Sequence, residues 1–526
     1  MKYKCCLLGV FQFPFHIKHL IILSSLCLLF VCSASIVIAG IEQQIDAGGT
    51  KQLIKQAKKL TDKGEFAEAE KVLRRVIEIN PQESKAKLNL AYVLVKQRRL
   101  LEAYNLSIEV AGAEPKNSYA FAVLGTTFLT AGNFPEAKIS FITSLKINRN
   151  QALTWAGLGM LDFYENRMTQ GLENLREAVY LDPEDANFIF TLAQIAARAE
   201  QFKESAAAYE KFLQISPHTD SDRRDRIKGL ISFLRFLGNR QSLYSQVDKK
   251  QTTVDIKLIN ERPVIKIKVN KNEEPLNFVL DTGSGVSVIS QETAQRLRIK
   301  AVSRGGLARA IGGSGKFEIV YGFLQSVSIG DVKIRNVPVY IRKFHSNDER
   351  IDGYIGLSLI SKFLTTLDYG NLTFSLKQKN SEEYKNVQVD NLSLPLRLTS
   401  SGFLSGEVKL EGIEAPLNFI VDTGASVSVI SDALAGTKEI SRFIKDEKMR
   451  VVGAAGITEN VPSFLLPRVS FGTHSRESLK AVALDLSIIN EASGFEQAGI
   501  LGGNFLKNYC LTFDFENSKV IFVPVK

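Results

Sequence analysis

The chain contains the same short segment twice. Residues 276–290 read Leu-Asn-Phe-Val-Leu-Asp-Thr-Gly-Ser-Gly-Val-Ser-Val-Ile-Ser, and residues 417–431 read Leu-Asn-Phe-Ile-Val-Asp-Thr-Gly-Ala-Ser-Val-Ser-Val-Ile-Ser. Each copy places one aspartate, Asp281 or Asp422, in an apolar run, where a carboxylate is costly to bury unless it is paired or used. The duplication therefore predicts two similar units, each with one acidic residue in matched surroundings.

Each aspartate is followed at the same distance by a glycine-rich stretch. Residues 309–315 read Arg-Ala-Ile-Gly-Gly-Ser-Gly, and residues 450–456 read Arg-Val-Val-Gly-Ala-Ala-Gly. The first glycine lies 31 residues after its aspartate in both copies (312 − 281 and 453 − 422). Glycine suits a hairpin tip that must move. We therefore predict two flaps, with tips that contain Gly312, Gly313, Gly315, Gly453 and Gly456.

A third element completes each unit. Two apolar residues followed by glycine occur at 354–357 (Tyr-Ile-Gly-Leu) and 500–503 (Ile-Leu-Gly-Gly), and each unit then closes with an alternating, strand-like stretch at 367–374 or 511–516. Together with Asp-Thr-Gly and the flaps, these elements resemble the retropepsin-like aspartic proteases over roughly 252–378 and 395–526. The alternative is two small β-domains with an aspartate in a tight turn.

The resemblance implies an aspartic endopeptidase whose two carboxylates share one proton. Since each retropepsin subunit of a homodimer gives one aspartate, two fused units predict a pseudo-dimer in which Asp281 and Asp422 face each other. One carboxylate takes a proton from water, and the other donates to the scissile carbonyl oxygen. The residues expected to support the two loops are Thr282, Gly283, Ser284, Thr423, Gly424 and Ser426. Pairing between two chains is the other possible arrangement.

One position departs from the family pattern. The fifth residue of the motif is often Ser or Asp, and Ser426 fits this in the second unit, whereas Gly285 stands there in the first. The departure predicts a weaker orientation of Asp281.

The N-terminal half carries a 34-residue repeat over 50–219. Its prolines fall at Pro81, Pro115, Pro183 and Pro217, with Arg149 at the intervening step. Proline ends a helix, and small residues let paired helices approach closely. The pattern resembles five tetratricopeptide repeats, with capping helices over 220–248. Their groove would recruit a substrate or partner protein, or the repeats would act as a rigid spacer. A non-catalytic scaffold with peptide-binding pseudo-protease units is the alternative function.

Residues 20–41 form an uncharged apolar run after Lys2, Lys4 and Lys18. We expect residues 1–41 to be a cleaved signal peptide or a membrane-anchoring signal segment, which exports the remainder to the periplasm or cell envelope of a bacterium. Four of the five cysteines lie in or before this run, so Cys510 alone cannot build a disulfide framework or a Cys-based metal site. We expect no cofactor and no metal.

The formal net charge is +10, without a dense Lys/Arg tract interleaved with aromatic residues, so nucleic-acid binding is not expected. A polar linker is expected over 379–394. The predicted fold class is multidomain, an all-α solenoid followed by two all-β retropepsin-like units that form a pseudo-dimer.

Overall fold

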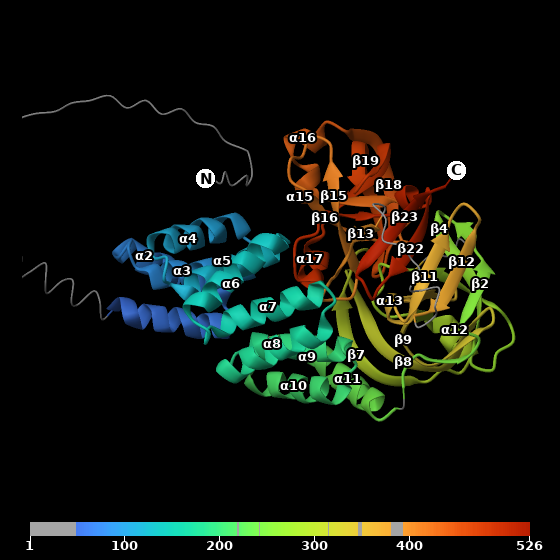
Figure 1. The fold of residues 1–526 in the computed structure, drawn as a ribbon, viewed down its shortest axis with the longest axis horizontal. Coiled ribbons are helices and arrows are strands. Elements are labelled where there is room, and N and C mark those ends of the chain that lie inside the picture. Colours follow the sequence, from blue (N-terminus) through green and yellow to red (C-terminus); the bar gives the residue numbers. More distant parts are fainter. Residues whose placement is uncertain are drawn as a thin grey trace, which may run out of the picture. The chain divides into compact units, whose positions relative to one another are not determined.

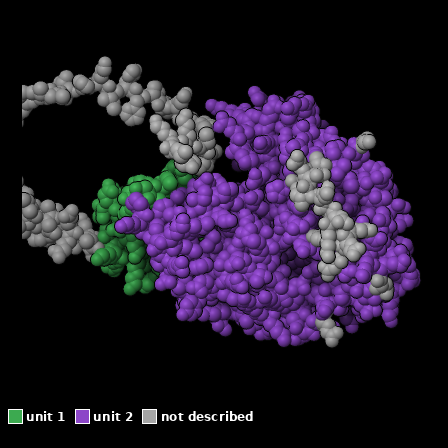
Figure 2. All heavy atoms as spheres, in the orientation of Figure 1, with its two compact units in different colours: residues 1–114 green, residues 115–526 purple. Residues whose placement is uncertain are grey.

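The computed structural model describes residues 49–217, 220–240, 242–313, 315–345, 350–379 and 393–525. The predicted signal segment and nearly all of the predicted linker lie outside these ranges. Within them, none of the helices combines the length and the apolar character that a bilayer crossing requires. The chain divides into two compact units, residues 1–114 (unit 1) and 115–526 (unit 2) (Figure 2).

Unit 1 consists of antiparallel helices. Residues 49–62 are helical and are followed by α2 (Phe66–Ile79), α3 (Ser84–Lys96) and α4 (Leu100–Ala113). The face of α2 that is buried carries Ala69, Leu73 and Val76 at helical spacing, as expected for an amphipathic helix.

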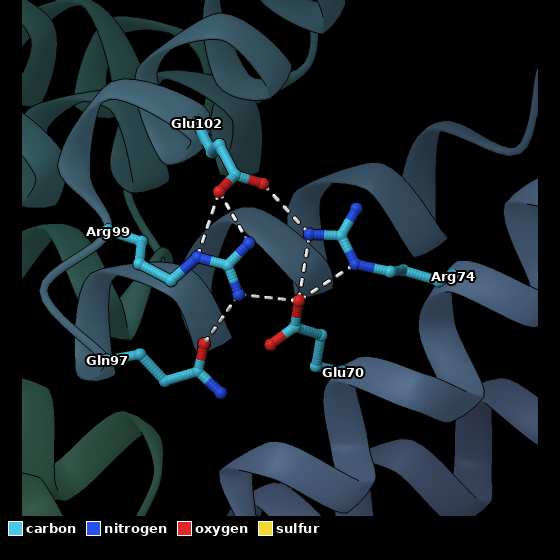
Figure 3. A network of polar contacts seen from close by, with 5 residues as sticks. All are labelled: Glu70, Arg74, Gln97, Arg99 and Glu102. Atoms are coloured by element: carbon cyan, nitrogen blue, oxygen red, sulfur yellow. Dashed lines mark hydrogen bonds and ion pairs between the residues drawn. The ribbon is translucent and has the colours of Figure 1, made fainter.

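A polar network joins α2 to the start of α4 (Figure 3). Arg99 Nη1 donates to Glu70 Oε1 at 2.7 Å, and Arg74 Nη2 donates to Glu102 Oε2 at 2.9 Å. The side chains of Arg74, Arg99 and Glu102 are 41–45% exposed and that of Glu70 is 15% exposed, so each pair contributes little by itself and the network chiefly orients neighbouring helices.

Unit 2 begins with further helices of the same kind. They are α5 (Ser118–Ala131), α6 (Phe134–Ile147), α7 (Ala152–Tyr164), α8 (Met168–Leu181), α9 (Ala186–Arg198), α10 (Phe202–Ile215) and α11 (Ser221–Gly238). A Cβ at Gly125 would lie 2.6 Å from the Phe141 ring, and one at Gly157 would lie 2.1 Å from it. Glycine at these positions therefore lets α5 and α7 close on α6. Within each unit the helices pack in chain order as tetratricopeptide hairpins do, α3 with α4 in unit 1 and α5 with α6, α7 with α8 and α9 with α10 in unit 2, where the solenoid ends with α11 on α10.

The prediction of a capping helix pair over 220–248 is wrong in its second half. The structure has one helix, α11, and then a strand, β1 (Ser245–Asp248), which pairs antiparallel with β9 (Val332–Arg342). Tyr244 N also donates to Asn336 O at 3.2 Å. Pairing with a distant strand satisfies the backbone of this segment, and no local pattern signals that partner.

The first β-unit continues from β1 to β12. Its own sheet has the order β1-β9-β6-β10-β5-β4-β8-β7, with β3 also paired to β4. The further bounds are β3 (Lys257–Ile259), β4 (Arg262–Val269), β5 (Leu276–Leu280), β6 (Val288–Ser290), α12 (Gln291–Arg296), β7 (Ala301–Arg309), β8 (Lys316–Ile329), β10 (Gly353–Ile355) and α13 (Leu357–Ile360).

The second β-unit repeats this arrangement in a sheet of order β14-β15-β16-β21-β17-β20-β19-β18. In the first unit β10 lies parallel to β5 and antiparallel to β6, and in the second β21 lies parallel to β16 and antiparallel to β17. The bounds are β14 (Arg397–Leu398), β15 (Leu404–Leu410), β16 (Leu417–Val421), β17 (Ser428–Ser431), α15 (Asp432–Ala435), α16 (Lys438–Ser441), β18 (Ile444–Gly453), β19 (Gly456–Phe471), β20 (His474–Leu484), α17 (Ser487–Ser493), β21 (Gly499–Leu501) and α18 (Gly503–Leu506).

A shared sheet joins the two β-units in the order β13-β23-β22-β11-β12-β2 (Figure 1). Its strands are β2 (Gln251–Asp255), β11 (Phe363–Asp368), β12 (Thr373–Gln378), β13 (Ser393–Pro395), β22 (Tyr509–Asp514) and β23 (Lys519–Pro524). At the centre β11 and β22 run antiparallel, with the hydroxyls of Thr366 and Thr512 3.0 Å apart. The two β-units therefore form a pseudo-dimer within one chain.

The stretch 367–374, predicted as one closing strand, instead contains the end of β11, the turn 369–372 and the start of β12. Asp368 Oδ1 accepts hydrogen bonds from the backbone N–H of Gly370 (2.9 Å) and Asn371 (3.0 Å). An aspartate that bonds to the backbone two residues on favours a turn over a continuous strand.

Candidate active site

The two Asp-Thr-Gly loops leave equivalent strands of the two β-units. Asp281 follows β5 and Asp422 follows β16. Asp281 N donates to Ile355 O on β10, and Asp422 N donates to Leu501 O on β21, both at 3.0 Å. The late apolar-apolar-Gly elements thus lie directly beside the aspartate loops and hold both in the same way.

The threonines of the two loops bond to each other across the pseudo-twofold axis. Thr282 N donates to Thr423 Oγ1 at 3.1 Å, and Thr423 N donates to Thr282 Oγ1 at 3.0 Å. Thr282 Oγ1 donates to Val421 O, and Thr423 Oγ1 donates to Leu280 O, each at 2.7 Å. Both threonines are buried, so these bonds form without competing water. The arrangement ties the two loops into one rigid base.

This base brings the two carboxylates together. A Cβ at Gly283 would lie 2.4 Å from Asp422 Oδ2, and a Cβ at Gly424 would lie 2.6 Å from Asp281 Oδ1. Each glycine therefore makes room for the opposite carboxylate. Each also donates its backbone N–H within its own loop, Gly283 N to Asp281 Oδ1 at 2.9 Å and Gly424 N to Asp422 Oδ1 at 2.7 Å.

The surroundings favour the protonated form of the pair. Burial raises the pKa of Asp281 well above its ordinary value, and the adjacent Asp422 carboxylate raises it further. Burial also raises the pKa of Asp422, although the Gly424 N–H opposes the shift. Two carboxylates this close cannot both ionise cheaply, so the pair retains one proton where isolated aspartates have lost theirs.

The predicted support residues Ser284 and Ser426 tie the loops to α13 and α18: their backbone oxygens accept from Leu357 N (2.8 Å) and Asn504 N (3.2 Å). The Ser284 hydroxyl also donates to Val286 O at 2.8 Å. Two more serines brace the loops, Ser287 and Ser428, whose hydroxyls accept from Gly356 N and Gly502 N, each at 3.1 Å. The sequence analysis missed them, although the identical Val-Ser-Val-Ile-Ser in both copies signals their position.

Gly285 has a steric explanation. A Cβ there would lie 2.5 Å from the backbone oxygen of Ser401 and 3.0 Å from Nη2 of Arg198, the last residue of α9. Arg198 Nη2 itself donates to Ser401 O. The first loop therefore carries glycine because the backbone of Ser401 and the solenoid residue Arg198 occupy the space that a side chain would need.

The predicted flap glycines lie at the tips of two hairpins, β7–β8 and β18–β19, which meet each other. Ala455 N donates to Ile311 O at 3.0 Å, and Gly313 N donates to Ile457 O at 3.2 Å. Gly315 closes its own turn by donating to Gly312 O at 2.9 Å.

Side chains could not be accommodated where the tips touch. A Cβ at Gly312 would lie 2.2 Å from Gly456 O, and one at Gly453 would lie 2.2 Å from Ile311 O. Gly312 and Gly456 also have φ of +99° and +136°, conformations that favour glycine. These glycines were predicted because the tip of a flap must move. The structure shows that they are also needed for the close contact between the two tips.

The first flap is attached to the solenoid through α11 (Figure 1). Ser303 Oγ donates to Gly229 O at 2.5 Å, and Arg226 Nη1 donates to Leu307 O at 2.6 Å. A Cβ at Gly229 would lie 2.1 Å from Arg304 O, so α11 and β7 touch backbone to backbone. Within the described ranges, no hydrogen bond or ion pair joins the β18–β19 hairpin to helices α5–α11.

A cavity of about 1220 Å³ extends from the aspartate pair beneath both flaps to helices α8–α11. Its walls include apolar side chains such as Ile311, Ile420 and Ile500, and several cations, among them Arg198 and Arg342. Neither arginine was singled out from the sequence, since each lies far along the chain from its neighbours here. Among the described residues, no cluster of three or more His, Cys, Asp or Glu side chains could hold a metal ion.

Family models match both halves of the chain. The aspartyl protease model matches residues 265–359 and 406–505, and two tetratricopeptide repeat models match residues 60–124 and 157–218. The chain therefore combines two retropepsin-like aspartyl protease units with N-terminal tetratricopeptide repeats.

Two curated relatives are similar over a length close to that of the repeats. Anaphase-promoting complex subunit 3 of Schizosaccharomyces pombe is 22% identical over 155 residues, 30% of this chain and 23% of that protein. Human tetratricopeptide repeat protein 6 is 22% identical over 153 residues, 29% of each chain. The chain thus spans less than a third of either relative.

Similar solved structures include a thermophilic TPR protein of Thermus thermophilus, with 18% identity and a TM-score of 0.31 over 35% of this chain and 98% of that one. Another is PilF of Pseudomonas aeruginosa, with 14% identity and a TM-score of 0.28 over 37% and 88%.

Proposed function

We propose that the protein is an aspartic endopeptidase whose active site is the Asp281/Asp422 pair. The observation that carries the proposal is the joint geometry of the pair: two carboxylates, held by crossed threonines, lie in one cavity beneath two flaps. A rigid base of this kind serves catalysis, because carboxylates held in place need no reorganisation during the reaction.

The proposed reaction uses the shared proton. The ionised carboxylate takes a proton from a water molecule, which attacks the scissile carbonyl carbon. The protonated carboxylate donates to the carbonyl oxygen as the tetrahedral centre forms. An extended peptide would lie beneath the flaps and pair with their backbone, since residues of both tips, Ile311 and Gly453, line the cavity.

The solenoid has a proposed role in recruiting the polypeptide. Helices α8–α11 form part of the cavity wall itself, so a bound chain would contact the repeats while it occupies the aspartate site. This favours recruitment over the alternative role of the repeats as a spacer.

The test is cleavage of a peptide mixture between about pH 4 and 7, read by mass spectrometry, for the wild type, Asp281→Asn and Asp422→Asn. Each variant should lose at least about 100-fold in kcat, because each carboxylate has its own proton-transfer role. Asp331→Asn, an exposed carboxylate in the turn between β8 and β9, is the matched control and should retain full activity.

Full activity in either single variant would contradict a dyad built within one chain. Restored activity on mixing the two inactive variants would indicate a site formed between chains. A wild type that binds the peptides and cleaves none would support the non-catalytic scaffold.

A further inference from the structure

The solenoid places a cation at the edge of the aspartate site. Arg198 ends α9 and lines the same cavity as Asp281 and Asp422. Its one hydrogen bond among the described contacts is from Nη2 to the backbone oxygen of Ser401. A guanidinium has five N–H donors in a fixed plane, so most of its donor capacity is left for a ligand in the cavity.

Two glycines create the space that Arg198 occupies. A Cβ at Gly285 would lie 3.0 Å from Nη2, and a Cβ at Gly402 would lie 2.3 Å from it. Gly402 also has φ of +87°, a conformation that favours glycine. Gly285 is four residues beyond Asp281 in the chain (285 − 281). The guanidinium therefore lies against the loop that carries the first carboxylate.

Within the described part of the chain, Arg198 forms no ion pair. The groups named as acting on its charge are the phenols of Tyr209, Tyr244 and Tyr340, and Glu200, which lines the same cavity, pairs instead with Lys362. Burial lowers the pKa of Arg198, but a guanidinium stays charged at physiological pH. A desolvated cation without a counter-charge is destabilising until an anion pairs with it.

A second arginine adds to the positive potential of the cavity. Arg342, at the end of β9, lines the cavity, and its buried Nε has no hydrogen-bond partner among the described residues. Its charge acts on the pair directly, since it lowers the pKa of Asp281 against the effect of burial. Lys343 and Arg262 line the same space. A polypeptide with acidic residues near its scissile bond fits these walls better than a neutral or basic one.

We propose that Arg198 forms a subsite for the carboxylate of an Asp or Glu side chain in the substrate, close to the scissile bond. The proposal rests on the proposed endopeptidase function. It also gives the solenoid a direct part in specificity, because Arg198 belongs to a repeat helix. Gly285 of the aspartate loop leaves the space that Arg198 occupies.

The experiment compares peptides that carry Glu or Gln at each position around the cleaved bond, using the full chain. The wild type should cleave one Glu peptide about 10- to 100-fold more efficiently than its Gln counterpart, the range for a charge-assisted hydrogen bond. Arg198→Met should abolish this preference mainly through KM, and Arg198→Lys should keep part of it. Arg198→Glu should prefer the matching Lys peptide.

Arg235→Met is the matched control, because Arg235 is an exposed arginine of α11 outside the cavity lining. Its Glu/Gln preference should equal that of the wild type. Equal cleavage of the Glu and Gln peptides by the wild type, or an unchanged preference in Arg198→Met, would overturn the subsite. Should Arg198→Met fail to fold, the wild-type Glu/Gln ratio and its reversal in Arg198→Glu decide the question.

Binding separates this inference from the proposed function. The Asp281→Asn chain should still bind the Glu peptide more tightly than the Gln peptide in a fluorescence-polarisation measurement. A preference in binding without cleavage by the wild type would refute the endopeptidase and keep the subsite. Cleavage by the wild type without any charge preference would refute the subsite and keep the endopeptidase.

Discussion

The two β-units have nearly the same aspartate loop and yet differ in how their flaps are held. Both loops exchange the same threonine bonds and make the same bond to the following apolar-apolar-Gly element. The first flap, however, is bonded to α11, whereas among the described contacts the second flap bonds to no helix of unit 2. The two loops thus form a symmetric base, whereas the contact of α11 with only the first flap makes the site above the base asymmetric.

This difference indicates how the site opens. The flap tips bond to each other, so the site opens between them only when at least one flap moves. Moving the first flap would break its bonds to α11 as well as those between the tips. We therefore expect the second flap, β18–β19, to be the one that opens.

The largest expected effect comes from separating the first flap from α11. Gly229→Ala puts a Cβ 2.1 Å from Arg304 O and should cost about 1–3 kcal/mol, as overpacking does. Alanine alone would favour the helix by about 1 kcal/mol, so any loss reports the lost contact with β7. Thermal unfolding gives the stability, and hydrogen exchange should show β7 amides becoming as labile as those of β18.

Gly112→Ala in α4 is the control, because nothing lies within 4 Å of its added Cβ. This variant should be as stable as the wild type or more so. Unchanged exchange in β7 of Gly229→Ala would show that α11 does not restrain the first flap.

A smaller effect should distinguish the two loops themselves. Gly285→Ser adds a Cβ 2.5 Å from Ser401 O, and we expect a loss of about 1–2 kcal/mol with reduced activity. The reciprocal change, Ser426→Gly, removes a side chain without a described hydrogen bond and should cost no more than about 1 kcal/mol. Unfolding temperatures of the two variants give the comparison. Equal losses of stability in the two variants would mean that Arg198 and Ser401 do not exclude a side chain from position 285.

The smallest effect is a pH dependence of stability. Both aspartates have a pKa raised above the unfolded value, so the folded chain binds more protons and its stability falls as pH rises above about 4. Asp281→Asn and Asp422→Asn should therefore gain thermal stability relative to the wild type as pH rises from about 4 to 8.

Both variants should show the gain, because each removes one of two buried carboxylates that raise the proton uptake of the folded chain. Unfolding temperatures measured across the pH range for both variants test this. A difference from the wild type that does not change with pH would contradict the raised pKa values.

Much of the fold was predictable because it is written in local, repeated patterns. The 34-residue period gave the helix hairpins, and the duplicated Asp-Thr-Gly segment gave two β-units. The glycine spacing placed the two hairpin tips that meet above Asp281 and Asp422. Where the chain pairs with a distant strand, as β1 does with β9, the local pattern gave a wrong prediction, a second capping helix.

The sequence by itself determined the two half-sites, because each is encoded in one short segment whose residues touch one another. Only the tertiary structure decided what surrounds them. Arg198 reaches Ser401 across 203 residues, and Ser303 reaches Gly229 across 74. Such contacts depend on how the solenoid packs against the β-units. This packing cannot be predicted from the residue spacing within a single segment. Gly285 therefore looked like a defect in the sequence and is, in the folded chain, the space that Arg198 and Ser401 occupy.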